Sequence, residues 1–169
     1  MTRQAFCRLA VILGFLVLSP AAFATHVCLF PTHSGGAGND VVVGGAGNDV
    51  VDGLGGDDFV FGRAGDDVVC GQTGNDSVFG EDGVDYVVGE WGNDIADGGN
   101  HGDTVDGGLD NDEVSGKGGN DEVYGWYGND ELYGNAGNDT CDGGDGTDTC
   151  DGGLGTDTCT NCETTVNCP

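Results

Sequence analysis

The chain has 169 residues, of which 36 are glycine, 30 are aspartate or glutamate and only 4 are lysine or arginine, giving a formal net charge of −26. This charge argues against nucleic acids and anionic membrane surfaces as partners. With only 3 prolines, the chain is neither collagen-like nor a proline-rich linker. Charge repulsion and the backbone entropy of glycine both oppose collapse. The chain is therefore either disordered or completed by something cationic.

Residues 1–24 have the pattern of a secretory signal peptide. Two arginines precede an apolar stretch from Leu9 to Leu18, and Ala-Phe-Ala at residues 22–24 forms a cleavage motif. The alternative, a membrane anchor, needs about 20 apolar residues. We expect cleavage before Thr25 and a secreted, extracellular protein, with retention at the cell surface left open. Cleavage removes two cations and no acid, so the mature chain would carry a net charge of −28.

A nine-residue period dominates residues 35–160. They divide into fourteen consecutive units without insertion, and the first reads Gly-Gly-Ala-Gly-Asn-Asp-Val-Val-Val. Position 1 is glycine in all fourteen units, position 4 is glycine in twelve, and position 6 is always aspartate. Position 8 is always valine, alanine, leucine or cysteine.

Each recurring position has a physical reason. Positions 7 to 9 can form a three-residue strand, with position 8 facing inward and positions 7 and 9 facing outward. Positions 1 to 6 must then turn the chain, and glycine permits positive φ and lets carbonyls converge without a Cβ in the way. The carboxylate at position 6 joins these carbonyls in a cluster of hard oxygen donors, which is the donor set of calcium.

Because the strand reverses after every unit, one full coil takes two units. Odd and even units then build two parallel sheets packed face to face, with strands about 4.8 Å apart. We predict an all-β parallel roll of about seven two-strand coils. An ion in each gap between neighbouring turns gives up to about twelve calcium ions. Their positive charge would offset most of the negative charge of the mature chain.

The candidate metal ligands are the fourteen position-6 aspartates. They are Asp40, Asp49, Asp58, Asp67, Asp76, Asp85, Asp94, Asp103, Asp112, Asp121, Asp130, Asp139, Asp148 and Asp157.

The unit Gly-Gly-x-Gly-x-Asp-x-apolar-x resembles the repeats-in-toxin (RTX) haemolysin-type calcium-binding nonapeptide. The resemblance spans residues 35–160. It implies a right-handed parallel β-roll with calcium between successive turns, held by backbone carbonyls and the position-6 aspartates. This chain departs from the family pattern in two expected features. Many relatives use an uncleaved C-terminal export signal, whereas the candidate signal of this chain is N-terminal. Many relatives also attach the roll to a toxin, protease, lipase or adhesin, and we identify none in this sequence.

Two units break the glycine pattern at position 4, where His101 and Asp110 stand. An L-residue at a positive-φ position costs about 1 kcal/mol, so we expect the weakest or distorted sites there. His101 as a transition-metal ligand is the alternative to a surface turn residue, but no other histidine is near it in the repeats. Position 2 often carries a larger side chain, which we expect to point outward without abolishing binding.

The segments flanking the repeats are expected to cover the ends of the roll. Residues 25–34 form a lead-in or cap, and residues 161–169, which keep the spacing but lose glycine and aspartate, form a cysteine-containing C-terminal cap. In this scheme Cys141 stacks on Cys159, and Cys150 stacks on Cys168. These cysteines either form at least one disulfide near the C-terminus or fill the core as small apolar residues. Cys28 and Cys70 could join if the lead-in folds over the roll.

Seven cysteines remain after cleavage, so at least one is free or pairs between molecules.

The function that we predict is a secreted, non-enzymatic calcium-binding module that folds on binding calcium. Adjacent carboxylates such as Asp57-Asp58 are explained as turn residues and ligands, and the chain has no catalytic motif. Ice binding is disfavoured because position 3 has a single threonine, Thr73, beside the frequent asparagine at position 5.

The alternative is an extracellular adhesion or interaction module in which calcium is only structural. The sheet of the odd-numbered units would expose Val41, Val43, Phe59, Phe61, Phe79 and Ile95 near its N-terminal end. Such a patch marks contact with a protein or glycan partner, or is covered by residues 25–34. Trp91 and the pair Trp126-Tyr127 lie on turns of one edge and could bind a glycan.

Overall fold

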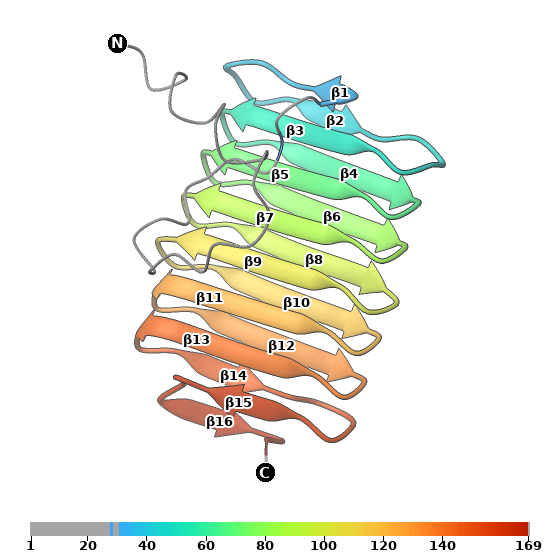
Figure 1. Ribbon diagram of the computed structural model, residues 1–169. Coiled ribbons are helices and arrows are strands. Elements are labelled where there is room, and N and C mark those ends of the chain that lie inside the picture. The colour runs from blue at the N-terminus through green and yellow to red at the C-terminus, as the bar shows by residue number, and fades with distance from the viewer. Residues whose placement is uncertain (1–27, 29–30, 169) are drawn as a thin grey trace, which may run out of the picture.

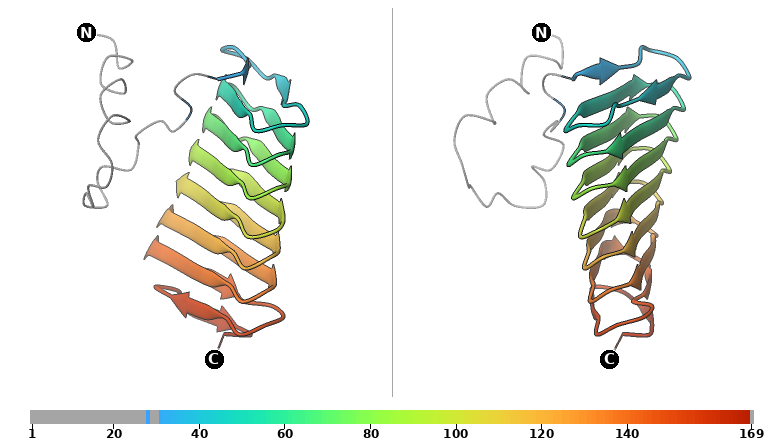
Figure 2. Two further views of the ribbon diagram at one scale, coloured as in Figure 1. Left: turned by 45° about the vertical axis from the view of Figure 1, so that its right-hand side comes forward. Right: turned by 90° about the vertical axis from the view of Figure 1, so that its right-hand side faces the viewer.

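The computed structural model describes Cys28 and residues 31–168, so the predicted signal peptide lies outside the described residues. Over that part of the chain every regular element is a strand. The strands coil into an elongated solenoid whose two sheets face one another, with the N- and C-terminal coils at opposite ends (Figures 1 and 2). No helix capable of crossing a membrane is found among these residues.

The two sheets have eight parallel strands each and alternate along the chain. The odd-strand sheet consists of β1 (His33–Ser34), β3 (Val50–Gly55), β5 (Val68–Thr73), β7 (Tyr86–Trp91), β9 (Thr104–Leu109), β11 (Glu122–Gly128), β13 (Thr140–Gly146) and β15 (Thr158–Thr160). The even-strand sheet consists of β2 (Val41–Val43), β4 (Phe59–Ala64), β6 (Ser77–Asp82), β8 (Ile95–Asn100), β10 (Glu113–Gly118), β12 (Glu131–Ala136), β14 (Thr149–Asp151) and β16 (Thr164–Val166).

The strand register confirms the predicted coil of two units. Val51 pairs with Val69, and Val69 pairs with Val87, so each residue lies beside the one 18 positions later. This offset holds from the β1–β3 pair through the β13–β15 pair. The parallel β-roll of about seven coils is therefore the fold of this chain.

The core is one column of position-8 side chains between the sheets. It runs from Val42 to Cys150, and every member after Val42 is fully buried. Valine dominates it, with single alanine and leucine residues at Ala96 and Leu132. Because each coil contributes only two such small side chains, apolar burial per coil is modest, at about 1.5–3 kcal/mol for each buried valine or leucine.

The strands are longer than the predicted three residues. Most span six, because positions 2 and 3 of the following unit also pair with the next coil, as Leu54 does with Gln72. Position 2 achieves this in the left-handed conformation, which non-glycine residues adopt at φ values between 70° and 86°. They are Leu54, Arg63, Gln72, Glu81, Glu90, Lys117, Trp126 and Asn135. Position 2 of the repeat therefore favours glycine because it requires positive φ, and in eight units an L-residue adopts this conformation at an energetic cost.

Position 5 links the turns through side-chain oxygens, which belong to asparagine in most coils and to Asp57 and Asp66 in two. On the edge formed by the odd-numbered units, the backbone N–H of Asn93 donates to Oδ1 of Asn75 (2.8 Å), and that of Asn111 donates to Oδ1 of Asn93 (3.1 Å). The series is continuous from Asn39 to Thr147. On the opposite edge Val84 and Gly102 occupy position 5 and supply no acceptor, so that series is interrupted. The recurring asparagine is thus an inter-coil hydrogen-bonding residue.

The described lead-in residues lie on the odd-strand sheet. Thr32 donates its N–H to the carbonyl of Val50, and Cys28 is bonded to Cys70 on β5, with Cα atoms 6.4 Å apart. Cys28 packs against Val88 and its neighbours. One of the two alternatives above was that the lead-in covers the apolar residues of the odd-numbered units. Those residues lie on the even-strand sheet, so the described lead-in residues do not cover them. Val27, Leu29 and Phe30 lie outside the described residues.

The last coil is shorter than predicted. Thr149 pairs with Thr164 and Cys150 with Thr165, an offset of 15 residues instead of 18. Residues 161–169 therefore do not keep the repeat spacing, and Cys168 does not enter the inward column above Cys150. Without glycine and aspartate the segment cannot form the wide turn of a full unit, and it shortcuts to the even-strand sheet.

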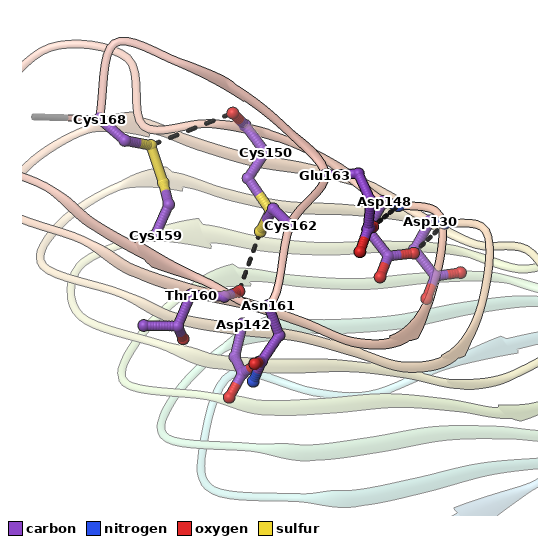
Figure 3. Close-up of a disulfide and its surroundings, with 10 residues drawn as sticks. All are labelled: Asp130, Asp142, Asp148, Cys150, Cys159, Thr160, Asn161, Cys162, Glu163 and Cys168. Atoms are coloured by element: carbon purple, nitrogen blue, oxygen red, sulfur yellow. Dashed lines mark hydrogen bonds between the residues drawn. A yellow bond between two sulfur atoms is a disulfide. The ribbon is translucent and has the colours of Figure 1, made fainter.

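Two disulfides fasten this shortened coil. Cys150 is bonded to Cys162 and Cys159 to Cys168, with Cα atoms 6.0 and 5.8 Å apart (Figure 3). Neither predicted stacked pair is bonded, although Cys141 does lie in register with Cys159. Cys141 is the free cysteine of the described residues, and burial raises the pKa of its thiol to about 12.

Replacing Leu54 by glycine should stabilise the roll. Leu54 is 38% exposed at φ 77°, so the substitution removes a left-handed L-residue at little packing loss, and the free energy of unfolding should rise by about 0.5–1 kcal/mol. Leu154→Gly is the matched control: Leu154 is 78% exposed and not at positive φ, and its replacement should cost about 0.5–1 kcal/mol. Urea denaturation in saturating calcium measures both; equal effects of the two variants would contradict the strain argument.

Candidate metal centre

The position-6 aspartates form two hydrogen-bonded ladders, one along each edge of the roll. In each step Oδ1 of one aspartate accepts the backbone N–H of the aspartate 18 residues earlier, as Asp76 does from Asp58 (2.8 Å). Twelve such bonds of 2.7–3.0 Å connect Asp40 to Asp148 and Asp49 to Asp157 in steps of one coil. Each carboxylate after Asp40 and Asp49 is therefore fixed against the preceding coil by one of its two oxygens.

The second oxygen of these carboxylates is buried without a hydrogen-bond donor. This holds for Oδ2 of Asp58, Asp67, Asp76, Asp85, Asp94, Asp103, Asp112, Asp121, Asp130, Asp139, Asp148 and Asp157. All twelve side chains are 1–4% exposed. A buried, unpaired carboxylate oxygen is costly, and buried charges are normally paired or bound to metal.

Position-1 glycine keeps the space beside Oδ2 open. A Cβ on Gly53 would lie 2.7 Å from Oδ2 of Asp58 and 2.8 Å from the carbonyl oxygen of Gly71 in the next coil. The same pair of oxygens borders Gly125, where the distances to Oδ2 of Asp130 and the Gly143 carbonyl are 2.5 and 2.6 Å. A carboxylate and a carbonyl from successive coils thus face a volume that any side chain would fill.

Position-4 glycine brings a further carbonyl to the same turn. A Cβ on Gly128 would collide with the carbonyl of Asp110 in the preceding coil and lie 2.7 Å from Oδ1 of Asp130. In the described part of the chain, no three His, Cys, Asp or Glu side chains gather into a metal-binding group. The donor set of each turn is therefore one carboxylate with backbone carbonyls, which suits calcium and not zinc or copper.

Burial raises the pKa of most of these carboxyls. Loss of hydration is the largest cause, and neighbouring carboxylates one coil away add to it, while the hydrogen bond from the preceding coil opposes it. The pKa rises to about 6 for Asp76, Asp85, Asp121 and Asp130, to about 7 for Asp94 and Asp103, and to about 9 for Asp112. Without a cation beside them, these carboxyls therefore take up protons at higher pH than ordinary aspartates, and Asp112 favours the protonated form at neutral pH.

The two aspartates of the first coil differ from the other twelve. Oδ2 of Asp40 accepts the N–H of Gly36 (2.7 Å), and Oδ2 of Asp49 accepts that of Gly45 (2.6 Å). The latter bond, followed by one from the Thr32 hydroxyl, lowers the pKa of Asp49. Of the fourteen predicted ligands, the structure therefore places twelve with an unpaired buried oxygen and two with that oxygen already paired.

Sequence reasoning missed Glu163 at the C-terminal end of one ladder. Its Oε2 accepts the N–H of Asp148 (2.7 Å), in the place that a position-6 aspartate occupies elsewhere (Figure 3). The carbonyls of Asn161 and Asn167 likewise stand beside Gly143 and Gly152, where full units place the carbonyl of the next position-1 glycine. The 15-residue offset alone brings Glu163 into this position, and no repeat pattern predicts it.

The irregular units around His101 and Asp110 alter the backbone but not the aspartate ladder. Their φ values are 83° and 78°, whereas glycines at position 4 with positive φ lie between 119° and 157°. The ladder bonds that Asp103 and Asp112 accept remain 2.8 and 2.9 Å long. His101 is exposed, and its Nδ1 lies 2.8 Å from the carbonyl of Asn100. The distortion is thus local to position 4.

Comparison with protein families agrees with this geometry. The model of the RTX calcium-binding nonapeptide repeat, which represents four copies, matches residues 34–69, 71–96, 97–126, 106–141 and 127–159. The chain belongs to this family. A search of curated proteins finds no match. The RTX repeats of this chain form a calcium-binding β-solenoid, and the matched repeat is a structural calcium-binding unit, not a catalytic domain.

Calcium-free protein should fold better in acid than at neutral pH. The carboxyl pKa values are raised in the folded state, so the folded roll binds more protons than the unfolded chain between about pH 4 and pH 9. Its stability is therefore fully present below the unfolded pKa and falls as pH rises through that window. Circular dichroism of protein dialysed free of calcium should show β signal increasing as pH is lowered from 8 to 4. A β signal that decreases on acidification would contradict the raised pKa values.

Asp67→Asn and Asp66→Asn form a matched pair of neighbouring charge changes. Asp67 has the unpaired buried Oδ2, whereas Asp66 is exposed at position 5, where asparagine is usual and its Oδ1 accepts from Val84. We expect Asp67→Asn to lower the calcium stoichiometry by about one ion and to destabilise the calcium-loaded roll by about 1–3 kcal/mol. Asp66→Asn should leave both unchanged. Calorimetric titration with calcium separates the two, and equal losses would show that only net charge matters.

Proposed function

We propose that this protein is a secreted calcium-binding β-roll whose folding is coupled to calcium. The ions would lie between successive turns, bound by the position-6 aspartates and backbone carbonyls. The observation that carries this proposal is the set of twelve buried Oδ2 atoms without donors, which equals the number of gaps between turns expected from seven coils.

Coupling to folding follows from charge. The mature chain would have a net charge of −28, and its buried ladder places carboxylates on neighbouring coils. The small valine column stabilises each coil only modestly, so binding energy must supply much of the difference. An ion that binds the folded state alone stabilises it by mass action. Millimolar extracellular calcium would then favour folding after export, while the chain stays unfolded where calcium is scarce.

The disulfides of the described residues support export. The candidate signal at residues 1–24 lies outside the described residues. One disulfide lies near the N-terminal end of the roll and two lie at its C-terminal end. Disulfides persist in oxidising compartments, including the cell exterior. We further propose the division into residues 25–34 as lead-in, residues 35–160 as the calcium-binding roll and residues 161–169 as C-terminal cap.

Calorimetric titration of mature, calcium-free protein at pH 7.5 tests this function directly. We expect about twelve ions per chain, accompanied by a gain of β signal in circular dichroism and a smaller hydrodynamic radius. A stoichiometry near two would reject the regular array of sites. Chelated protein that remains as compact and protease-resistant as the loaded form would reject the coupling to folding.

A second candidate function is extracellular adhesion through the even-strand sheet, with calcium only structural. Its outer face exposes 69% of Val41, 52% of Phe59 and 44% of Ile95, and Phe61 stacks on Phe79 with ring centroids 5.1 Å apart. The described lead-in residues lie on the opposite sheet. Exposed apolar patches of this kind mark contact surfaces. Loss of cell or protein binding in Phe59→Ser, with unchanged calcium stoichiometry, would favour this function.

A further inference from the structure

One edge of the roll carries a column of large side chains at position 3. Trp91 at the end of β7 pairs with Leu109 of β9, and Leu109 pairs with Tyr127 of β11. Tyr127 in turn lies beside Asp145 of β13. The register therefore stacks these four residues on successive coils, and Trp91 and Tyr127 stand two strand spacings apart, about 9.6 Å along the axis.

This column borders a shallow hollow of about 600 Å³. Trp91, Leu109 and Tyr127 line it together with Asp110, Asn111 and Asn129. Trp91 is 46% exposed. A second hollow of about 220 Å³ adjoins it, since Tyr127 and Asp145 line both, and there Tyr124 stacks on Trp126 with ring centroids 5.8 Å apart. The first hollow extends along the axis over the coils of Trp91, Leu109 and Tyr127, and it is called the groove below.

Asp110 places a carboxylate in this groove at a conformational cost. It stands at position 4, where the flanking coils have Gly92 and Gly128, and its φ is 78°. A left-handed L-residue costs about 1–2 kcal/mol. Asp110 lines the groove together with Trp91 of the preceding coil and Tyr127 of the following coil.

The polar groups of the groove are mixed hydrogen-bond donors and acceptors. Asn111 and Asn129 are joined in the position-5 series, in which Nδ2 of Asn129 donates one hydrogen to Oδ1 of Asn111 (2.9 Å). Each amide has two N–H groups, so one of them remains directed away from this bond. Asp110 and Asp145 supply acceptors, and neither lysine nor arginine lines either hollow.

This combination selects a ligand class. The carboxylates disfavour anionic ligands, and a cationic ligand cannot accept hydrogen bonds from the amide N–H groups. A neutral sugar has hydroxyls that both donate and accept, and its C–H faces pack on aromatic rings. The coils that line the groove are about 4.8 Å apart, close to the length of one pyranose residue in an extended chain.

We propose that this groove binds a linear, neutral polysaccharide along the axis of the calcium-loaded roll. Trp91 and Tyr127 would stack on sugar rings, and Asp110 and the amides of Asn111 and Asn129 would bind hydroxyls. The roll must be folded to assemble the groove, so sugar binding requires calcium.

Titration of the calcium-loaded protein with cellohexaose and chitohexaose, followed by tryptophan fluorescence and calorimetry, tests the proposal. Circular dichroism and calcium stoichiometry are measured first on each variant, so failure to fold is distinguished from failure to bind sugar. We expect at least one hexasaccharide to bind, and Trp91→Ala to weaken it by about tenfold or more. Leu154→Ala, a substitution of an exposed apolar residue at position 3 of the opposite edge, should bind the sugar as the parent does.

Asp110→Gly provides an opposed pair of effects. It removes a strained residue, so the thermal midpoint in calcium should rise by about 2–4 °C, while sugar affinity should fall by about tenfold. A purely structural residue would not move the two in opposite directions. Absence of binding by both hexasaccharides, binding that Trp91→Ala leaves unchanged, or binding of hexalysine in their place would overturn the proposal.

Discussion

The structure depends on the repulsion between buried carboxylates and on whatever relieves it. Twelve of the fourteen position-6 aspartates are fixed by one oxygen to the backbone of the preceding coil, and their other oxygen is buried without a hydrogen-bond donor. An aspartate so placed is unfavourable as an isolated charge, yet in this chain the arrangement recurs on every full coil after the first. In the function that we propose, a hard divalent cation in each gap between turns would complete its coordination with this oxygen and backbone carbonyls, and no further side chain would be needed.

The glycines and asparagines around this array serve it in different ways. Position-1 glycine leaves open the volume beside Oδ2, and position-4 glycine lets successive turns approach. The asparagine amides hold the turns at a constant spacing from outside. Disulfides stabilise both ends of the array, where a neighbouring coil is missing. Cys28–Cys70 lies at the first coils, and two disulfides and the hydrogen bond accepted by Glu163 stabilise the last coil. Array proteins need such terminal caps because end units lack one interface.

The nine-residue period was sufficient to predict the roll, its 18-residue register and the inward valine column, because every coil meets the same constraints. It also identified the aspartates whose second oxygen is unpaired. It could not separate Asp40 and Asp49 from the rest, since their pairing depends on the missing preceding coil. It also failed where the pattern stops: the 15-residue final coil is set by turn length and disulfides, which no periodicity encodes. The left-handed backbone of position 2 was hidden because the large side chains there suggested an ordinary outward residue.

The unequal asparagine series gives the roll two mechanically different edges. One edge has inter-coil hydrogen bonds at position 5 from Asn39 to Thr147. The other edge lacks these hydrogen bonds at Val84 and Gly102, which have no side-chain acceptor. If the solenoid is pulled along its length, strain concentrates at Val84 and Gly102, and the coils part there while the edge with the continuous hydrogen bonds still acts as a hinge. The molecule would therefore yield in its middle and by bending, not by unravelling from a disulfide-fastened end.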